Sequence, residues 1–126
     1  MINLDYKDGR SLHEQIEAGF KELIINGILL ADEQLPSVRE LSVSLTVNPN
    51  TVQRAYKQLE LDGYIYSVKG KGNFVAPIQG KKDEKKAEEL YSNLTAIVKE
   101  LMFMGEEKNT VENIINNIYR EREDKE

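Results

Sequence analysis

Side chains that can hydrogen-bond to the edges of bases gather between residues 48 and 54. Asparagine and glutamine amides can each make two hydrogen bonds to adenine, and an arginine guanidinium can do the same with guanine. The positions concerned are Asn48, Pro49, Asn50, Thr51, Gln53 and Arg54. If they lie at the start of a helix, its amino end also favours a phosphate. The stretch therefore predicts a surface that enters the major groove of double-stranded DNA.

A helix that begins after Asn48 is needed to present these side chains. Asn48 is a favourable N-cap residue, and Pro49 suits the first helical position because an N–H there would have no partner. Apolar residues recur behind it at helical spacing: Val52, Ala55, Tyr56 and Leu59. Asp62 and Gly63 are a suitable end. We therefore predict an amphipathic helix that runs from Pro49 as far as Asp62-Gly63.

A second, shorter helix should precede it and turn sharply into it. Ser37 and Glu40 have the spacing of a capping box, in which each side chain bonds to the other residue's backbone amide. Val38, Leu41 and Leu45 follow on one side. The turn between the two helices is too short for an antiparallel pair, so they should cross steeply. This is the pattern of a helix-turn-helix.

The pattern changes from helix to strand after Gly63. Residues 64–68 and 73–75 are rich in β-branched and aromatic types. Between them, Lys69–Gly72 reads Lys-Gly-Lys-Gly and supplies the glycines of a tight turn. A phosphate cradle is the alternative, but the strand–loop–helix setting of a P-loop is missing. A helix-turn-helix followed by a hairpin with a basic tip is a winged helix.

Together these motifs resemble the DNA-binding domain of the GntR family of bacterial transcription regulators. The matching segments are SLHEQI (residues 11–16), LPSVREL (35–41), VNPNTVQRAYKQLE (47–60) and DGYIYSVKGKGNFV (62–75). The short remainder resembles the YtrA-like branch, which has two C-terminal helices in place of a large effector domain. The resemblance implies a winged helix-turn-helix that binds an operator in double-stranded DNA.

The resemblance also implies individual DNA contacts. Arg39 would contact a base or a phosphate in the major groove, and the wing tip would approach the minor groove. The implied contact residues are Ser37, Arg39, Asn48, Pro49, Asn50, Thr51, Gln53, Arg54, Lys69, Gly70 and Lys71. Pro49 and Gln53 stand where some relatives carry arginine, so the preferred DNA sequence should differ from theirs. Plainer alternatives are a solvated Arg39 and an Arg54 paired with an acid of its own helix.

Residues 1–78 should form this DNA-binding domain, with one more helix ahead of the other two. Ser11 and Glu14 form another capping box, and the helix should end near Asn26-Gly27. Its apolar stripe is Leu12, Ile16, Phe20, Leu23 and Ile24. Thr46 departs from the family pattern, which commonly has glycine between the second and third helices. If that position requires a positive φ, threonine costs on the order of 1 kcal/mol or more.

Residues 79–126 are predicted to form a linker and two further helices. From Ala87 to Met104, apolar residues alternate at spacings of three and four, a heptad seam that Gly105 ends. A last helix should start at Asn109 or Thr110. The residues expected at a dimer contact are Leu90, Leu94, Ile97, Leu101, Met104, Ile114, Ile115 and Ile118. A hairpin this small cannot bury both stripes by itself, so we predict a homodimer. The alternative is that it folds back onto its own winged helix.

Composition disfavours several other classes of protein. The chain has no cysteine, which excludes disulfides and zinc–thiolate sites, and no nucleophile–base pair or metal cluster is visible. No enzyme activity and no cofactor are therefore predicted. No apolar run approaches the roughly 20 residues of a membrane span, and a signal peptide is missing, so a cytoplasmic protein is expected. The net charge is −5, yet residues 36–75 hold five basic and three acidic residues.

We therefore expect a mostly α-helical chain with a small β-hairpin wing and a two-helix dimerisation tail. Its expected function is sequence-specific regulation of transcription, most simply repression by a homodimer on a near-palindromic operator. The alternative is a winged helix that serves only as a protein-interaction module. The tail is too short for the effector domain of larger relatives. A small-molecule effector would have to bind at the dimer interface, or another signal would release the operator.

Overall fold

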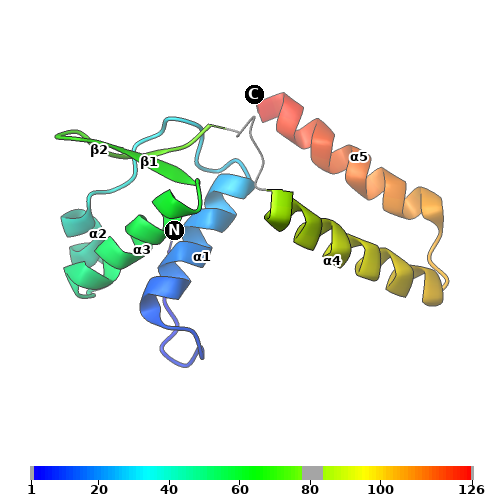
Figure 1. Cartoon of the computed structure of the whole chain (residues 1–126), viewed down its shortest axis with the longest axis horizontal. Coiled ribbons are helices and arrows are strands. Elements are labelled where there is room, and N and C mark those ends of the chain that lie inside the picture. Colours follow the sequence, from blue (N-terminus) through cyan, green and yellow to red (C-terminus); the bar gives the residue numbers. More distant parts are fainter. Residues whose placement is uncertain (1, 78–83, 126) are drawn as a thin grey trace. The chain divides into compact units, whose positions relative to one another are not determined.

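The computed structural model describes residues 2–77 and 84–125. They form two compact units, Met1–Gln79, here called the head, and Gly80–Glu126, here called the tail. The elements are α1 (Leu12–Ile25), α2 (Val38–Leu45), α3 (Pro49–Leu61), β1 (Ile65–Val68), β2 (Gly72–Val75), α4 (Glu84–Phe103) and α5 (Lys108–Lys125) (Figure 1). The predicted fold class, mostly helical with one hairpin, is confirmed. The predicted boundary between residues 78 and 79 lies outside the described residues.

The caps that start α2 and α3 are those that the sequence predicts. The Ser37 hydroxyl accepts from the amide of Glu40 at 3.0 Å, and the Glu40 carboxylate accepts from the amide of Ser37 at 3.2 Å. The Asn48 side-chain oxygen accepts from the amide of Asn50 at 2.8 Å, and Pro49 is the first helical residue. α2 ends at Leu45 and the Asn48 cap begins α3 only a few residues later, so the two helices must cross steeply.

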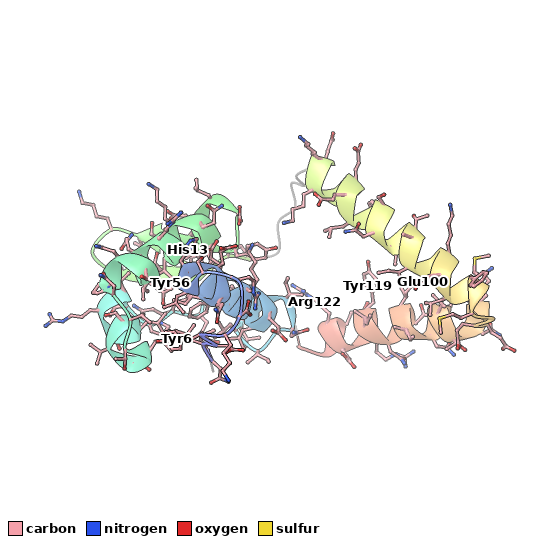
Figure 2. The ribbon with its side chains drawn as sticks, turned by 90° about the horizontal axis from the view of Figure 1, so that it is seen from below. Tyr6, His13, Tyr56, Glu100, Tyr119 and Arg122 are labelled. Atoms are coloured by element: carbon pink, nitrogen blue, oxygen red, sulfur yellow. The ribbon has the colours of Figure 1, made fainter. Side chains whose placement is uncertain are left out.

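The core of the head surrounds the buried ring of Tyr56 (Figure 2). Its ring meets that of Phe20 edge-on, with centroids 5.7 Å apart and planes at 77°. Its hydroxyl donates to the backbone carbonyl of Pro36 at 2.7 Å. The core residues are Ile2, Ile16, Phe20, Leu29, Leu35, Leu41, Val52, Ala55, Tyr56, Leu59, Ile65 and Val75. Tyr56 thus joins α1, α3 and the segment that leads into α2.

Replacing Tyr56 with phenylalanine should lower the free energy of unfolding by about 1 kcal/mol, because the Pro36 carbonyl loses its partner. Burial raises the pKa of the Tyr56 phenol, so its hydroxyl remains a donor at neutral pH. Urea unfolding measures the change. Tyr6→Phe is the matched control, since that ring is exposed (Figure 2). Equal changes in the two variants would contradict the role given to the Tyr56 hydroxyl.

The two strands form an antiparallel hairpin that is attached to the head along one edge. Ile65 pairs with Val75 at its base, and Val68 pairs with Gly72 beside its tip. Backbone hydrogen bonds connect β2 to the segment 32–35 between α1 and α2. The hairpin is therefore anchored at its base and projects its tip beyond the core.

The turn between α2 and α3 holds Thr46 in the left-handed region, with φ 57° and ψ 48°. This is the positive φ that glycine would accept without strain. We expect Thr46→Gly to raise the free energy of unfolding by about 1 kcal/mol, because the exposed threonine side chain contributes little packing there. Thermal unfolding measures the change, and Thr46→Ala, which keeps a Cβ, should gain much less. A melting temperature that stays the same or falls in Thr46→Gly would contradict this explanation.

The tail is a helical hairpin in which α4 is followed by a turn at Gly105, with φ 85°. The predicted start of the last helix at Asn109 or Thr110 is wrong, because α5 begins at Lys108. The Glu107 carbonyl already accepts from the amides of Thr110 and Val111, at 3.2 and 3.4 Å, so it closes the first turn. In the described part of the chain, no helix has both the length and the apolarity of a membrane span.

Candidate nucleic-acid interface

The amino end of α3 presents its polar side chains to solvent. The opposite face is held in the core by Val52, Ala55, Tyr56 and Leu59. The exposed positions are Asn48, Pro49, Asn50, Gln53 and Arg54, whereas Thr51 is partly buried. The Asn48 oxygen caps the helix, which leaves its amide NH₂ as the group that can donate to a base. Donors and acceptors of this kind can distinguish base pairs in the major groove.

Arg39 lies in the first turn of α2. It follows Pro36, whose carbonyl accepts a hydrogen bond from Tyr56, by three residues. Its side chain is exposed, as is that of the capping residue Ser37. None of the ion pairs found among the described residues involves Arg39 or Arg54. Both guanidinium groups can therefore bind an acceptor on another molecule without breaking a salt bridge of the head.

The tip of the hairpin consists of Lys69, Gly70 and Lys71, all exposed. The amide of Lys71 donates to the carbonyl of Val68 at 2.9 Å, and Gly70 has a φ of 78°. Because a side chain is strained at this φ, glycine allows the turn to be this tight. The two lysine side chains flank the glycine and place two positive charges at the far end of the head.

An open groove separates α3 from the hairpin. It is lined by Gln53, Tyr56, Lys57 and Glu60 on the helix and by Ser67, Val68, Lys69, Gly70, Lys71, Gly72 and Asn73 on the hairpin. Three of these residues are lysines, so the groove suits a phosphate backbone. Lys57 was not among the predicted contact residues. It lies three positions after Arg54, so helical periodicity alone could have placed it on the same face.

Other residues that shape the interface could not be found from local patterns. The Gln34 amide donates to the carbonyl of Lys71 at 2.9 Å. The Tyr66 hydroxyl donates to the carboxylate of Asp32 at 2.7 Å, and its ring stacks on Phe74. These contacts hold the outer face of the hairpin against the segment before α2. The two hydrogen bonds join residues 37 and 34 positions apart in the sequence, and no spacing rule predicts them.

The tail leaves its apolar side chains exposed. Of the predicted dimer residues, Leu101 is partly buried, and the others are exposed: Leu90, Leu94, Ile97, Met104, Ile114, Ile115 and Ile118. Further large apolar side chains of the tail are also exposed: Tyr91, Met102, Phe103 and Tyr119. Tyr119 is labelled in Figure 2. No side chain described in residues 84–123 is buried. The tail thus has a larger apolar surface than the predicted seam alone.

The arrangement of the head is that of a winged helix-turn-helix, a class of DNA-binding fold in which the second helix of the motif enters the major groove. Residues 12–75 match the profile of the bacterial regulatory proteins of the gntR family. The chain therefore belongs to the GntR family, and it is a DNA-binding regulator by class. This confirms the family that the motifs indicated.

Individual relatives agree with this assignment. Over 76 residues the chain is 42% identical to the HTH-type transcriptional repressor YtrA of Bacillus subtilis (strain 168), a match that covers 60% of this chain and 58% of YtrA. The chain thus spans less than two thirds of the length of that relative. The likeness agrees with the YtrA-like branch that the short tail indicated. Relatives found by sequence are named as transcription regulators, not as enzymes.

Solved structures give the same result. The crystal structure of a transcriptional antiterminator from Listeria monocytogenes EGD-e has a TM-score of 0.68 and 32% identity, over 93% of this chain and 88% of that one. A second structure is AraR(DBD) in complex with operator ORE1. Its TM-score is 0.52 at 29% identity, over 60% of this chain and 93% of that one. A head of this fold is therefore known in complex with an operator.

Proposed function

We propose that the chain represses transcription as a homodimer bound to a near-palindromic operator. The observation that carries the proposal is a head surface in two parts: the amino end of α3 is exposed, and beyond it α3 borders one groove with the lysine-tipped hairpin from Gln53 to Glu60. The structure of AraR(DBD) with its operator supports the use of such a head on DNA. The name of YtrA, a repressor, supports the sign of regulation.

Base recognition is proposed for the exposed polar face of α3 and for the start of α2. Asn50, Gln53 and Arg54 would face base edges, and Arg39 would reach a base or phosphate beside them. Ser37 and the amino end of α3 would meet phosphates. The remaining proposed contacts are Asn48, Pro49, Thr51, Lys69, Gly70 and Lys71, the last three toward the minor groove.

Dimerisation is proposed for the tail, whose exposed apolar stripes need a partner. A two-fold dimer places two heads on half-sites about one helical turn apart, roughly 34–36 Å. Repression then follows from occupation of the promoter and requires no catalytic group or cofactor. Because the proposed target is the bacterial chromosome, the proposed place of action is the cytoplasm.

Selection of bound duplexes from a random pool tests this function. A sequence-specific dimer should enrich an inverted repeat whose half-sites are about 10–10.5 base pairs apart, centre to centre. Placed over a promoter, that repeat should lower expression of a reporter when the chain is present. A pool without enrichment would contradict specific DNA binding and favour the protein-interaction module. A rise in reporter expression would contradict repression.

The phosphate contacts predict a steep salt dependence of affinity. The logarithm of the association constant should fall linearly with the logarithm of salt concentration, by about 0.9 for each phosphate neutralised. Lys57→Ala should reduce this slope by about 1 per head, because Lys57 lines the groove. Fluorescence anisotropy over a salt series measures the slope. A slope near zero for the unaltered chain, or an unchanged slope for Lys57→Ala, would contradict these assignments.

A further inference from the structure

Glu60 is an acidic residue in a groove that is otherwise suited to phosphate. It lies in the last turns of α3 and lines the groove together with Lys57, Lys69 and Lys71. A carboxylate at this position repels the DNA backbone and should weaken binding. One oxygen of the Glu60 carboxylate already accepts two hydrogen bonds, however. Oε2 accepts from the backbone amide of Ser67 at 3.0 Å and from the Ser67 hydroxyl at 2.6 Å.

Ser67 is the last residue of β1 that faces α3 before the hairpin tip. Side chains alternate along a strand, so Ser67 shares a face with Ile65, which is in the core. Ser67 and Val68 are both exposed, whereas Ile65 is buried. The Glu60–Ser67 contact, here called the helix–wing brace, therefore ties the hairpin to α3 at the point where it leaves the core.

The opposite edge of the hairpin, formed by β2, has its own attachment. Gln34 donates to the carbonyl of Lys71 at 2.9 Å. Its amide nitrogen also lies so close to Gly72 that a side chain at that position would collide with it. This contact limits movement of the tip away from the segment 32–35, but it does not set the distance from the tip to α3. Among the side-chain hydrogen bonds of the described residues, those of Glu60 connect α3 to the hairpin.

We propose that Glu60 is a positioning residue. It fixes the distance between the wing and α3 so that the two sides of the groove contact the same DNA backbone. The proposal rests on the proposed function, since it concerns the same DNA site. The charge of Glu60 weakens binding, whereas its hydrogen bonds order the wing lysines before DNA arrives. The second effect outweighs the first, because a wing that must be ordered on binding loses affinity.

Two substitutions separate the charge from the hydrogen bonds. Glu60→Gln removes the charge but keeps an oxygen that can accept from Ser67, whereas Glu60→Ala removes both. Glu60→Gln should therefore bind the selected duplex as tightly as the unaltered chain, or more tightly. Glu60→Ala should bind about three- to tenfold more weakly. Its salt slope should also fall by about 1 per head, because a wing lysine is no longer held at a phosphate.

The matched pair at Ser67 tests the brace from the other side without a change of charge. Ser67→Ala removes the hydroxyl that makes the 2.6 Å contact and should weaken binding in the same direction as Glu60→Ala. Ser67→Thr retains a hydroxyl and should restore affinity and salt slope. If Glu60→Ala fails to fold in a thermal melt, this pair carries the test. Glu22→Gln, an exposed acid on α1, should leave binding unchanged.

The result that overturns the proposal is a Glu60→Ala variant that binds as tightly as Glu60→Gln, with an unchanged salt slope. Glu60 would then act only as a repelling charge. An equal affinity of Ser67→Ala and Ser67→Thr would overturn it as well. Failure of the proposed function gives a different result, in which the unaltered chain already prefers no duplex over any other.

Discussion

Replacing Arg39 with alanine should abolish specific retardation of the operator without unfolding the head or dissociating the proposed dimer. An arginine that makes two hydrogen bonds to a base contributes about 1–3 kcal/mol of discrimination, and a dimer loses this contribution in both half-sites. A loss of about 2 kcal/mol or more corresponds to a reduction in specific affinity of about 30-fold or more. Stability should change little, because the side chain is exposed and no ion pair of the described head involves it.

Gel retardation at physiological salt, with excess unrelated duplex, measures this effect. Arg39→Lys is the matched variant, since it keeps the positive charge but not the planar fork of donors. If Arg39 contacts a base, the lysine variant should bind unrelated duplexes more tightly than Arg39→Ala does. It should still fail to distinguish the operator from them. If it contacts a phosphate, lysine should restore most of the affinity. Specific retardation by Arg39→Ala would show that Arg39 is not a recognition residue.

Replacing Ile97 with glutamate should convert the proposed dimer into a monomer and remove most of the operator affinity. Ile97 lies in the middle of the heptad seam and is 56% exposed in the single chain. A dimer would enclose two unpaired carboxylates at this position, at a cost of several kcal/mol each. Separate heads also lose the gain from binding two half-sites at once, which is about 10²–10⁴-fold.

Sedimentation or light scattering measures the mass of this variant, and anisotropy measures its DNA affinity. Ser92→Glu is the control, because it adds the same charge to α4 at an exposed position well away from the seam around the helix. The control should remain a dimer with normal affinity. A dimeric Ile97→Glu variant would contradict the role proposed for the seam. A monomeric one that binds the operator normally would contradict the need for two heads.

Much of the head could be predicted because its signals are local. Ser37 with Glu40, and Asn48 with Pro49, define the starts of two helices within a few residues each, and the structure confirms them. The conflict predicted at Thr46 is also local, because the short turn requires one residue with positive φ. Residue type and spacing are sufficient where the partners in a contact are at most one helical turn apart.

The remainder depends on contacts between distant residues or on a competing local signal. Gln34 and Lys71 meet only after the hairpin has packed beside the segment before α2. Glu60 could be recognised as exposed, but its partner depends on how the hairpin leaves α3. Asn109 and Thr110 are favourable N-cap residues and therefore predict a later start for α5 than Lys108, whereas the Glu107 carbonyl closes its first turn.

Hydroxyl-radical footprinting of the unaltered chain on the selected duplex tests the central claim most directly, namely that the α3–wing surface reads DNA as a symmetric pair. We expect two protected regions on one face of the duplex, about one helical turn apart and related by the symmetry of the repeat. Lys69→Ala combined with Lys71→Ala should remove the minor-groove protection that flanks each half-site and leave the centre of each half-site covered. A single asymmetric footprint, or protection that does not depend on the sequence, would contradict the account.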